Sequence, residues 1–293
     1  MSYFLVITLT GIAAGMIYAA LALALVLIWR ATRIVNFAQG ALAMTTTYIA
    51  LAVIQATDNY WLGFAVALAA GFALGAVAER FVVRWVETGP PLNAVILTLG
   101  LLLVLEAVVP MIWGAQIRSF PAPFSISATQ IGDVVISGLT PFNVFTIAVV
   151  LLVMVAMFVL FRFTNIGLQM RAAAFAPVIA RLLGVRVGRL LTLGWGLASI
   201  AGALAGMLVA PTLLLYPNNM DAILVYGFTA AVLGGLDSPI GALVGGLGIG
   251  LALAYIGGYL GSDLEAIGAL LILIAILMVR PEGIFVHGAE RRA

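Results

Sequence analysis

The sequence predicts an all-α polytopic membrane protein with about eight to ten transmembrane helices, some of them short or broken. Of its 293 residues, 65% are hydrophobic and only 8% are charged, and the apolar residues form solid runs. A soluble domain has about a quarter of its residues charged, so this chain must use lipid as its solvent. Barrel strands would instead alternate polar and apolar residues. The 32 glycines suit close helix packing in lipid.

Nine apolar segments are candidate spans, because most approach the roughly 20 residues that a membrane helix needs. They cover residues 4–29, 38–56, 62–79, 93–113, 141–161, 190–210, 222–236, 239–258 and 264–279. The first apolar run is longer than that of a signal peptide, so Met1 to Ile28 is predicted as a spanning helix. Segment 222–236 is short and is a candidate for a broken or re-entrant helix.

The arginines predict the orientation of these spans. All thirteen basic residues are arginine. If the N-terminus lies outside and all nine segments cross, only Arg118 falls on the outer side. The positive-inside rule therefore predicts a periplasmic N-terminus and a cytoplasmic C-terminus. If segment 222–236 is re-entrant, another segment must restore the odd number of crossings.

The longest outer loop covers residues 114–140. Pro121 and Pro123 precede an alternation of hydroxyl and apolar residues. This pattern predicts an extended or hairpin cap that faces the periplasm, and a simple connector is the alternative.

The residues that the chain lacks exclude several kinds of site. There is no cysteine, which excludes disulfides, cysteine metal sites and thiol catalysis. The one histidine, His287, lies in the C-terminal tail, and no span holds the paired groups of an intramembrane enzyme. The chain has no lysine and hence no G-x-x-x-x-G-K-[ST] loop. We therefore expect no catalytic residue, metal or cofactor here, and any ATP must be used by partner subunits.

A basic island, residues 162–189, interrupts the apolar chain with five arginines and no acid. Such a segment cannot lie in hydrocarbon, so we expect a large cytoplasmic loop. A helix is predicted after Asn165 as N-cap, from Gly167 to Leu183, with Gly184 as its stop signal. Because proline costs roughly 3 kcal/mol inside a helix, Pro177 predicts a break into two short helices.

One face of this helix pair is predicted to be apolar. Its members are Leu168, Ala172, Ala176 and Ile179, with the arginines left in water. The residues alone leave two interpretations open: a helix lying on anionic lipid, or an insert into a groove of a partner protein.

Five polar residues within the spans are candidates for the translocation pathway. Asn36 and Gln39 line the pathway or satisfy the backbone of a broken helix. Thr45 brings a hydroxyl deeper into the second span, and Thr98 opens the fourth. Glu106 is a proton carrier, an amine-binding group or one end of a buried pair, unless it reaches the outer interface.

Other polar stretches receive structural interpretations. Glu79 and Arg80 are predicted to form an ordinary interfacial pair. Asp237-Ser238-Pro239 is predicted to be a sharp turn. An outer turn is predicted from Pro211, Tyr216, Pro217, Asn218 and Asn219.

Several stretches carry a resemblance to a known family. They are GMIYAALALALVLIWRATRIVNFAQGALAM, VILTLGL, RAAAFAPVIARLLGV, LASIAGALAGML, AVLGGLDSPIGALVGGLGIG and VRPEGIF. In this order they resemble the LivH-type inner-membrane permeases of branched-chain amino acid ABC importers, over nearly the whole chain. The match departs at Gln39 and Ala41, where the family's I-x-N-F-A-H-G-D has histidine and acid. The resemblance thus leaves urea and small aromatic or organic carboxylates as alternative substrates.

The resemblance implies a single permease domain over residues 1–293 of a bacterial inner-membrane importer. Its partners would be two cytoplasmic ATPases, a second related permease or a second copy, a periplasmic binding protein and membrane lipid, but no nucleic acid. The island would dock into a groove of the ATPase. The implied docking positions are Gly167, Arg171, Ala172, Ala180, Leu183 and Gly184. A competing interpretation is an ion-coupled carrier with Glu106 as its ion site and the island as a lipid-binding loop.

Overall fold

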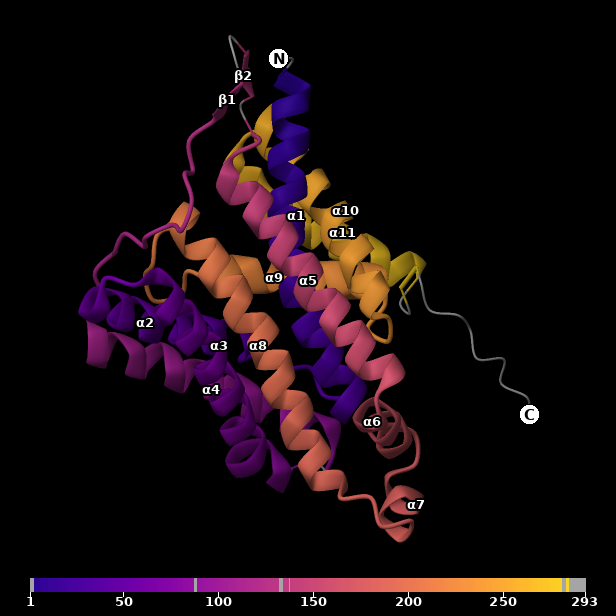
Figure 1. Cartoon of the computed structure of the whole chain (residues 1–293). Helices are drawn as coiled ribbons and strands as arrows, with labels where there is room; N and C mark the ends of the chain where they lie inside the picture. Colours follow the sequence, from indigo (N-terminus) through magenta and orange to yellow (C-terminus); the bar gives the residue numbers. More distant parts are fainter. Residues whose placement is uncertain (1–2, 87–88, 132–133, 137, 281–282, 285–293) are drawn as a thin grey trace.

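The computed structural model describes residues 3–86, 89–131, 134–136, 138–280 and 283–284 as a helical bundle with one short hairpin (Figure 1). His287, Arg291 and Arg292 lie outside the described residues. The elements in chain order are α1 (Tyr3–Thr32), α2 (Gln39–Thr57), α3 (Tyr60–Val77), the π-helical turn η1 (Ala78–Val82), the 3-10 turn η2 (Val83–Trp85), α4 (Pro91–Trp113), β1 (Thr129–Ile131), β2 (Val134–Ile136), α5 (Pro141–Phe163), α6 (Asn165–Phe175), α7 (Pro177–Leu182), α8 (Val187–Leu213), α9 (Asp221–Gly234), α10 (Pro239–Tyr259), the 3-10 turn η3 (Ser262–Leu264) and α11 (Glu265–Val279).

Eight helical segments in the described part of the chain are long and apolar enough to cross a membrane, which confirms the predicted class. Two of them are composite: α3 continues through η1 and η2 (Tyr60–Trp85), and η3 continues into α11 (Ser262–Val279). The remaining predicted segment, 222–236, forms α9 with only 14 residues. At about 1.5 Å per residue such a helix is shorter than the roughly 30 Å hydrocarbon core. α9 therefore cannot cross a bilayer by itself.

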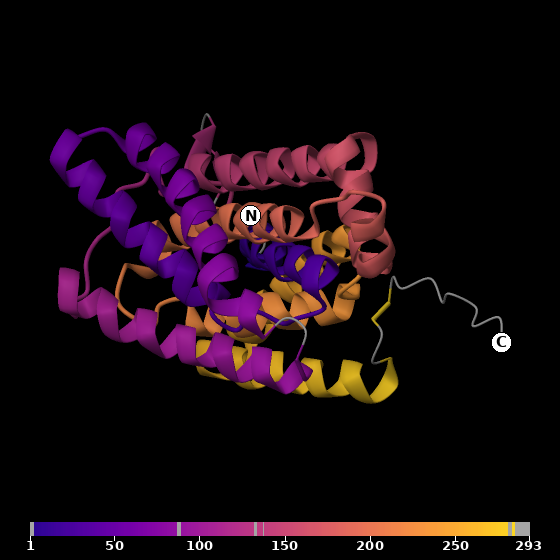
Figure 2. The ribbon, with the colours of Figure 1, turned by 90° about the horizontal axis from the view of Figure 1, so that it is seen from below.

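Helix α1 occupies the middle of the bundle. In its most apolar window 89% of the residues are buried, against 11% in the corresponding windows of α4 and α11. Seen from below, α1 lies between α5 along one side and α4 and α11 along the opposite side (Figure 2). A helix that is apolar all round suits such a central position, because each of its faces meets another helix.

Small residues let α10 approach α1 closely. A Cβ added at Gly15 would lie 2.9 Å from the carbonyl oxygen of Gly246, and one added at Gly250 would lie 2.2 Å from the Cα of Gly15. Backbone contact of this kind is typical of helices that associate in lipid, where dispersion rather than the hydrophobic effect holds them together.

The bundle has two distinct ends. At one end, Tyr3 at the start of α1 donates to the carbonyl of Gly258 near the end of α10. The hairpin of β1 and β2 lies at the same end, which we call the hairpin end (Figure 1). Arg33 pairs with Asp237 at the opposite, α7 end. The hairpin is confirmed by its antiparallel pairing from Thr129–Ile136 to Ile131–Val134. Its periplasmic location stays a prediction.

Arginines gather at the α7 end, because the ends of α1 and α5, the turns η1 and η2, the helix pair and the start of α8 all meet there. Arg118 instead pairs its backbone with Leu215, just beyond the far end of α8. Among the described arginines, Arg118 therefore lies toward one end of the bundle and the others lie toward the opposite end. This is the same division that the sequence predicted between the two sides of the membrane.

Helices α2 and α9 both begin halfway along the bundle. Gln39, the first residue of α2, contacts Ala198 and Gly202 in the middle of α8. A Cβ added at Gly40 would lie 3.3 Å from both the Met220 carbonyl and the Leu224 Cβ. The chain thus turns back after α8, and α9 completes the return to the α7 end. Residues 214–234 form the broken span that the short segment predicted.

Of two turns predicted from the sequence, one differs in the structure and one is confirmed. Pro211 lies inside α8 rather than in the turn that follows, so the predicted outer turn is too long. The turn at Asp237 is confirmed, with the Ser238 hydroxyl accepting from the Gly241 amide at 2.9 Å to cap α10. Asp237 in addition pairs with Arg33, a long-range contact that no local pattern indicates.

Candidate functional site

The basic island folds into two short helices, α6 and α7, as Pro177 predicted. Pro177 is the first residue of α7, where a missing amide costs no helical hydrogen bond. The predicted N-cap was wrong: Thr164 has extended backbone, and its hydroxyl accepts from the Gly167 amide at 3.2 Å, whereas Asn165 is already helical. Gly184 has φ +84°, a conformation that glycine adopts without strain, and it follows the last turn of α7.

The helix pair has a buried side and an exposed side. Met170, Ala173 and Ala180 pack with Leu190 and Leu191 of α8. On the apolar face that was predicted to meet lipid or a partner, Leu168 and Ile179 are each 58% exposed, and Ala172 is exposed as well. The sequence did not predict which side packs against α8, because apolar residues occur on both sides of this short segment.

The outward side of the helix pair is an apolar surface within a basic segment. Its large residues are Phe175 (94% exposed), Val178 (66%), Leu182 (82%) and Leu183 (79%). Exposed apolar patches of this kind mark interaction sites. We name these four residues the outward patch.

The six predicted docking residues divide between the two sides. Arg171, Ala172, Leu183 and Gly184 are exposed, whereas Gly167 and Ala180 are buried. A Cβ at Gly167 would lie 2.4 Å from the Phe161 carbonyl oxygen, so only glycine lets α6 begin this close to α5. Gly167 and Ala180 therefore position the helix pair, and the other four remain available to a partner.

A partly buried ion pair fixes the start of α8, which follows the helix pair. Glu79 of η1 is 1% exposed and accepts from Arg84 at 3.0 and 2.9 Å and from the Thr192 hydroxyl at 2.6 Å. Arg84 also donates to the Gly188 carbonyl at 2.7 Å. The predicted interfacial pair of Glu79 with Arg80 was wrong, because the partner is Arg84. These contacts connect the end of α3 to the first turns of α8.

The polar pathway candidates Asn36 and Gln39 lie at the start of α2 and are fully buried. The Asn36 amide donates to Gln39 Oε1 at 3.0 Å, and Asn36 Oδ1 accepts from the Ala38 backbone at 3.1 Å. Gln39 Nε2 lies 3.5 Å from the Ala198 carbonyl. Of the two interpretations, pathway lining and hydrogen bonding to backbone groups, these contacts match the second.

Two hydroxyls of the candidate pathway are also buried. Thr98 of α4 donates to the Val95 carbonyl at 3.1 Å and lies 3.5 Å from the Val35 carbonyl, beside Asn36. Thr45 donates to the Ala41 carbonyl of its own helix at 2.7 Å. The structure thus brings Asn36, Gln39 and Thr98 together, whereas Thr45 lies further along α2.

Glu106 is half-buried and lies near Asp221, the first residue of α9, and near Asn218 in the turn before it. Its role stays a prediction, and this neighbour is a second acid rather than a basic partner. Sequence reasoning missed Asp221. The signal that could have found it is an acid directly before a short apolar segment, which marks the N-terminal turn of a broken helix.

Comparison with known proteins shows the family of the chain. Residues 7–279 match the family model described as "Branched-chain amino acid transport system / permease component". The chain belongs to this permease family. It is 30% identical to the high-affinity branched-chain amino acid transport system permease protein LivH of Escherichia coli K12, over 96% of this chain and 95% of LivH.

Two further matches have lower coverage or lower sequence identity. The guanosine ABC transporter permease protein NupQ of Bacillus subtilis is 31% identical over 66% of this chain and 61% of its own. The solved structure of PsaBC from Streptococcus pneumoniae in complex with Fab is 13% identical, with a TM-score of 0.49 and coverage of 96% and 93%.

Family and fold together identify the class of protein. The chain is a multi-pass inner-membrane permease subunit of an ABC importer, a class that works with ATPase and substrate-binding partners. This assignment decides against the ion-coupled carrier as the main function.

Proposed function

We propose that the chain forms part of the translocation pathway of an ATP-driven importer for branched-chain or related amino acids. The similarity to LivH supports this substrate class, because it extends over 96% of this chain and 95% of LivH. We further propose that the chain binds no ATP itself, since it lacks lysine and hence a phosphate-binding loop of the Walker type.

The outward patch and its neighbours Arg171, Ala172 and Gly184 are proposed to contact the cytoplasmic ATPase. A patch of four exposed apolar side chains on two short helices is suited to a protein groove. Movement of a docked ATPase would then reach α8 directly, because Ala180 packs with the same cluster as Leu190 and Leu191.

The remaining assembly is proposed from the family resemblance. Two ATPases, a second permease or second copy of this chain, and a periplasmic binding protein would complete the importer. The α7 end would face the cytoplasm, as its arginines favour. Cargo would pass near the starts of α2 and α9, with Asn36, Gln39, Thr45, Thr98 and Glu106 near its route.

Co-purification tests the ATPase contact. A tagged chain should bring down ATPase subunits in a fixed ratio, and this recovery should fall at least tenfold when Leu182 and Leu183 are both replaced by Asp. The control replaces exposed Leu103 and Val104 of α4 by Ser. Recovery that is equal in all three proteins would contradict the docking role.

Binding of radiolabelled leucine to the cognate periplasmic protein, and its ATP-dependent uptake into vesicles, tests the substrate. Leucine should bind and be taken up, and unlabelled urea, benzoate or guanosine should not compete. Competition by guanosine alone would place the chain with the nucleoside transporters that NupQ represents.

A further inference from the structure

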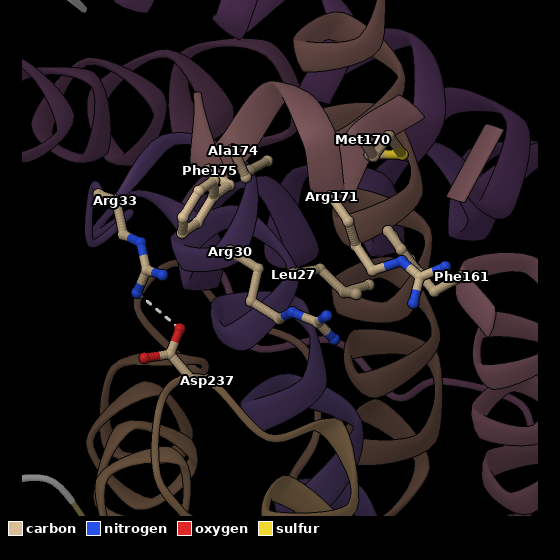
Figure 3. Close-up of a pocket in the computed structure, with 10 residues that line it drawn as sticks. Leu27, Arg30, Arg33, Phe161, Met170, Arg171, Ala174, Phe175 and Asp237 are labelled. Carbon is tan, nitrogen blue, oxygen red and sulfur yellow. Dashed lines mark hydrogen bonds and ion pairs between the residues drawn. The ribbon is translucent and has the colours of Figure 1, made fainter. Parts of the chain in front are cut away.

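A pocket of about 350 Å³ opens at the α7 end, where α1, α5, α6 and the turn between α9 and α10 meet (Figure 3). Three arginines line it, Arg30 and Arg33 from α1 and Arg171 from α6, together with one acid, Asp237. Three positive charges less one negative charge leave a formal charge of +2 on its walls. The pocket is therefore electrostatically suited to an anion.

The single acid of the pocket is already paired. Arg33 Nη1 lies 2.6 Å from Asp237 Oδ1. In Figure 3 the guanidiniums of Arg30 and Arg171 point to the other side of the pocket, away from this pair. Arg30 is close enough to Asp237 and, with a smaller effect, to Arg171 to feel the charge of each.

Arg30 and Arg171 retain most of their hydrogen-bond donors. Among the described residues neither forms an ion pair. Arg171 reaches only the Gly167 carbonyl, at 3.4 Å, and Arg30 lies over the Phe161 ring at 5.9 Å. A guanidinium has five N–H donors, so the two groups together offer a fork-shaped donor set that matches the oxygens of an anion.

We propose that this pocket binds a phosphate group between Arg30 and Arg171. Phosphate offers several charged oxygens to two guanidiniums at once, whereas one carboxylate would neutralise only half of the surplus charge. The rest of the lining is mainly apolar, including Leu27, Phe161 and Phe175. Such a lining accommodates a phospholipid headgroup with its glycerol, and the volume also admits free inorganic phosphate.

A bound phosphate would hold α6 against the end of α1. Arg30 belongs to the buried central helix, and Arg171 belongs to the helix pair that carries the outward patch. One anion between them would offset their mutual repulsion and restrict the movement of α6. Arg171 and Phe175 are shared with the proposed ATPase contact. The test therefore uses this chain alone, so that its outcome depends neither on the identity of the cargo nor on ATPase docking.

The test uses the purified full-length chain in maltoside micelles, which contain no phosphate, with two arms that separate the sources. In the lipid arm, phosphatidylglycerol is titrated into the micelles, and diacylglycerol, which lacks the phosphate, is the control. In the phosphate arm, inorganic phosphate is titrated at constant ionic strength with chloride. The readouts are the midpoint of thermal unfolding and retention of lipid or phosphate in native mass spectrometry.

We expect at least one arm to raise the unfolding midpoint and show saturable binding. Arg30→Gln should weaken that binding at least tenfold, since it removes a charge-assisted hydrogen bond. Arg30→Lys keeps the charge but loses the fork of donors, so its affinity should lie between those of the wild type and Arg30→Gln. Arg189→Gln removes an exposed arginine outside the pocket and should bind like the wild type.

Binding in only one arm identifies the source as lipid or free phosphate. The proposal is overturned if neither arm binds, or if Arg30→Gln and Arg189→Gln lose equal affinity, because the effect would then be net charge and not this pocket. If Arg30→Gln does not fold, Arg171→Gln, whose side chain is exposed, gives the same comparison from the other wall.

Discussion

At the scale of single residues, Glu79 and Arg84 owe their contact to an unusual helical turn. In an α-helix, residues five apart point about 140° away from each other. Glu79 instead lies in the π-helical turn η1, which is wider than an α-helical turn, and Arg84 lies in the 3-10 turn η2 that follows it. A sequence read with α-helical periodicity therefore finds the charges but not their pairing.

Replacing Glu79 by Gln should destabilise the protein. The change leaves Arg84 charged beside Thr192 and Gly188 without its carboxylate. Because Arg84 is partly exposed to solvent, we expect a loss of about 1–3 kcal/mol, less than for a fully buried pair. The midpoint of thermal unfolding in nanodiscs measures it. Asp58→Asn, at an exposed helix end, is the control, and an equal midpoint for both variants would contradict the role of the pair.

At the scale of elements, the helix pair shows what local sequence signals can predict. Pro177 and Gly184 act through their own backbones, so the break and the end of the pair were predictable. The buried face was not, because α8 selects it by packing against Met170 and Ala173. The same limit applies to Glu106, whose neighbour Asp221 is 115 residues further along the chain.

Bulk at Gly184 should interfere with a partner and not with the fold. Nothing lies within 4 Å of a Cβ added there. We expect Gly184→Trp to reduce ATP-dependent uptake more than tenfold while the chain still inserts in the membrane. Gly184→Ala is the control, because alanine carries the same strain at positive φ without the bulk of tryptophan. Uptake that falls equally in both variants would point to backbone strain as the cause.

The contact between α1 and α10 should be sensitive to a single branched side chain. Gly15→Val places atoms 2.9 Å from the backbone of Gly246 and Leu247, so the two helices must separate. Overpacking of this kind costs about 1–3 kcal/mol, which should lower the unfolding midpoint by several degrees. Gly100→Val makes the same change on α4, where nothing lies within 4 Å. A lower midpoint for Gly100→Val than for Gly15→Val would contradict the packing argument.

At the scale of the whole molecule, length and hydropathy predicted the spans, because a lipid-facing helix must be apolar throughout. Which helix lies at the centre and which at the periphery was not predictable, because all the spans are apolar. Runs such as α1 and α4 are alike in composition, yet α1 is central and α4 peripheral. Only the small residues that permit backbone contact, such as Gly15 and Gly246, distinguish the buried run.

The predicted orientation can be measured because the chain contains no cysteine. Ser127→Cys, in the loop near the hairpin, should react with a membrane-impermeant maleimide in intact spheroplasts. Leu183→Cys, in the outward patch, should react only after lysis. The reverse pattern would invert the topology, and labelling of both in intact spheroplasts would place the two ends on one side.

The central position of α1 has a consequence for how the protein is made. α1 is synthesised well before its neighbours α8, α9 and α10, which begin at residue 187 and end at residue 259. At about 5–20 residues per second, the ribosome needs roughly 8–45 s to deliver them. During that interval α1 must wait in the bilayer or beside the insertion machinery. Its apolar surface, which later meets other helices, first serves as a surface for lipid. The order of biogenesis thus constrains the future core of this permease to be soluble in the membrane on its own.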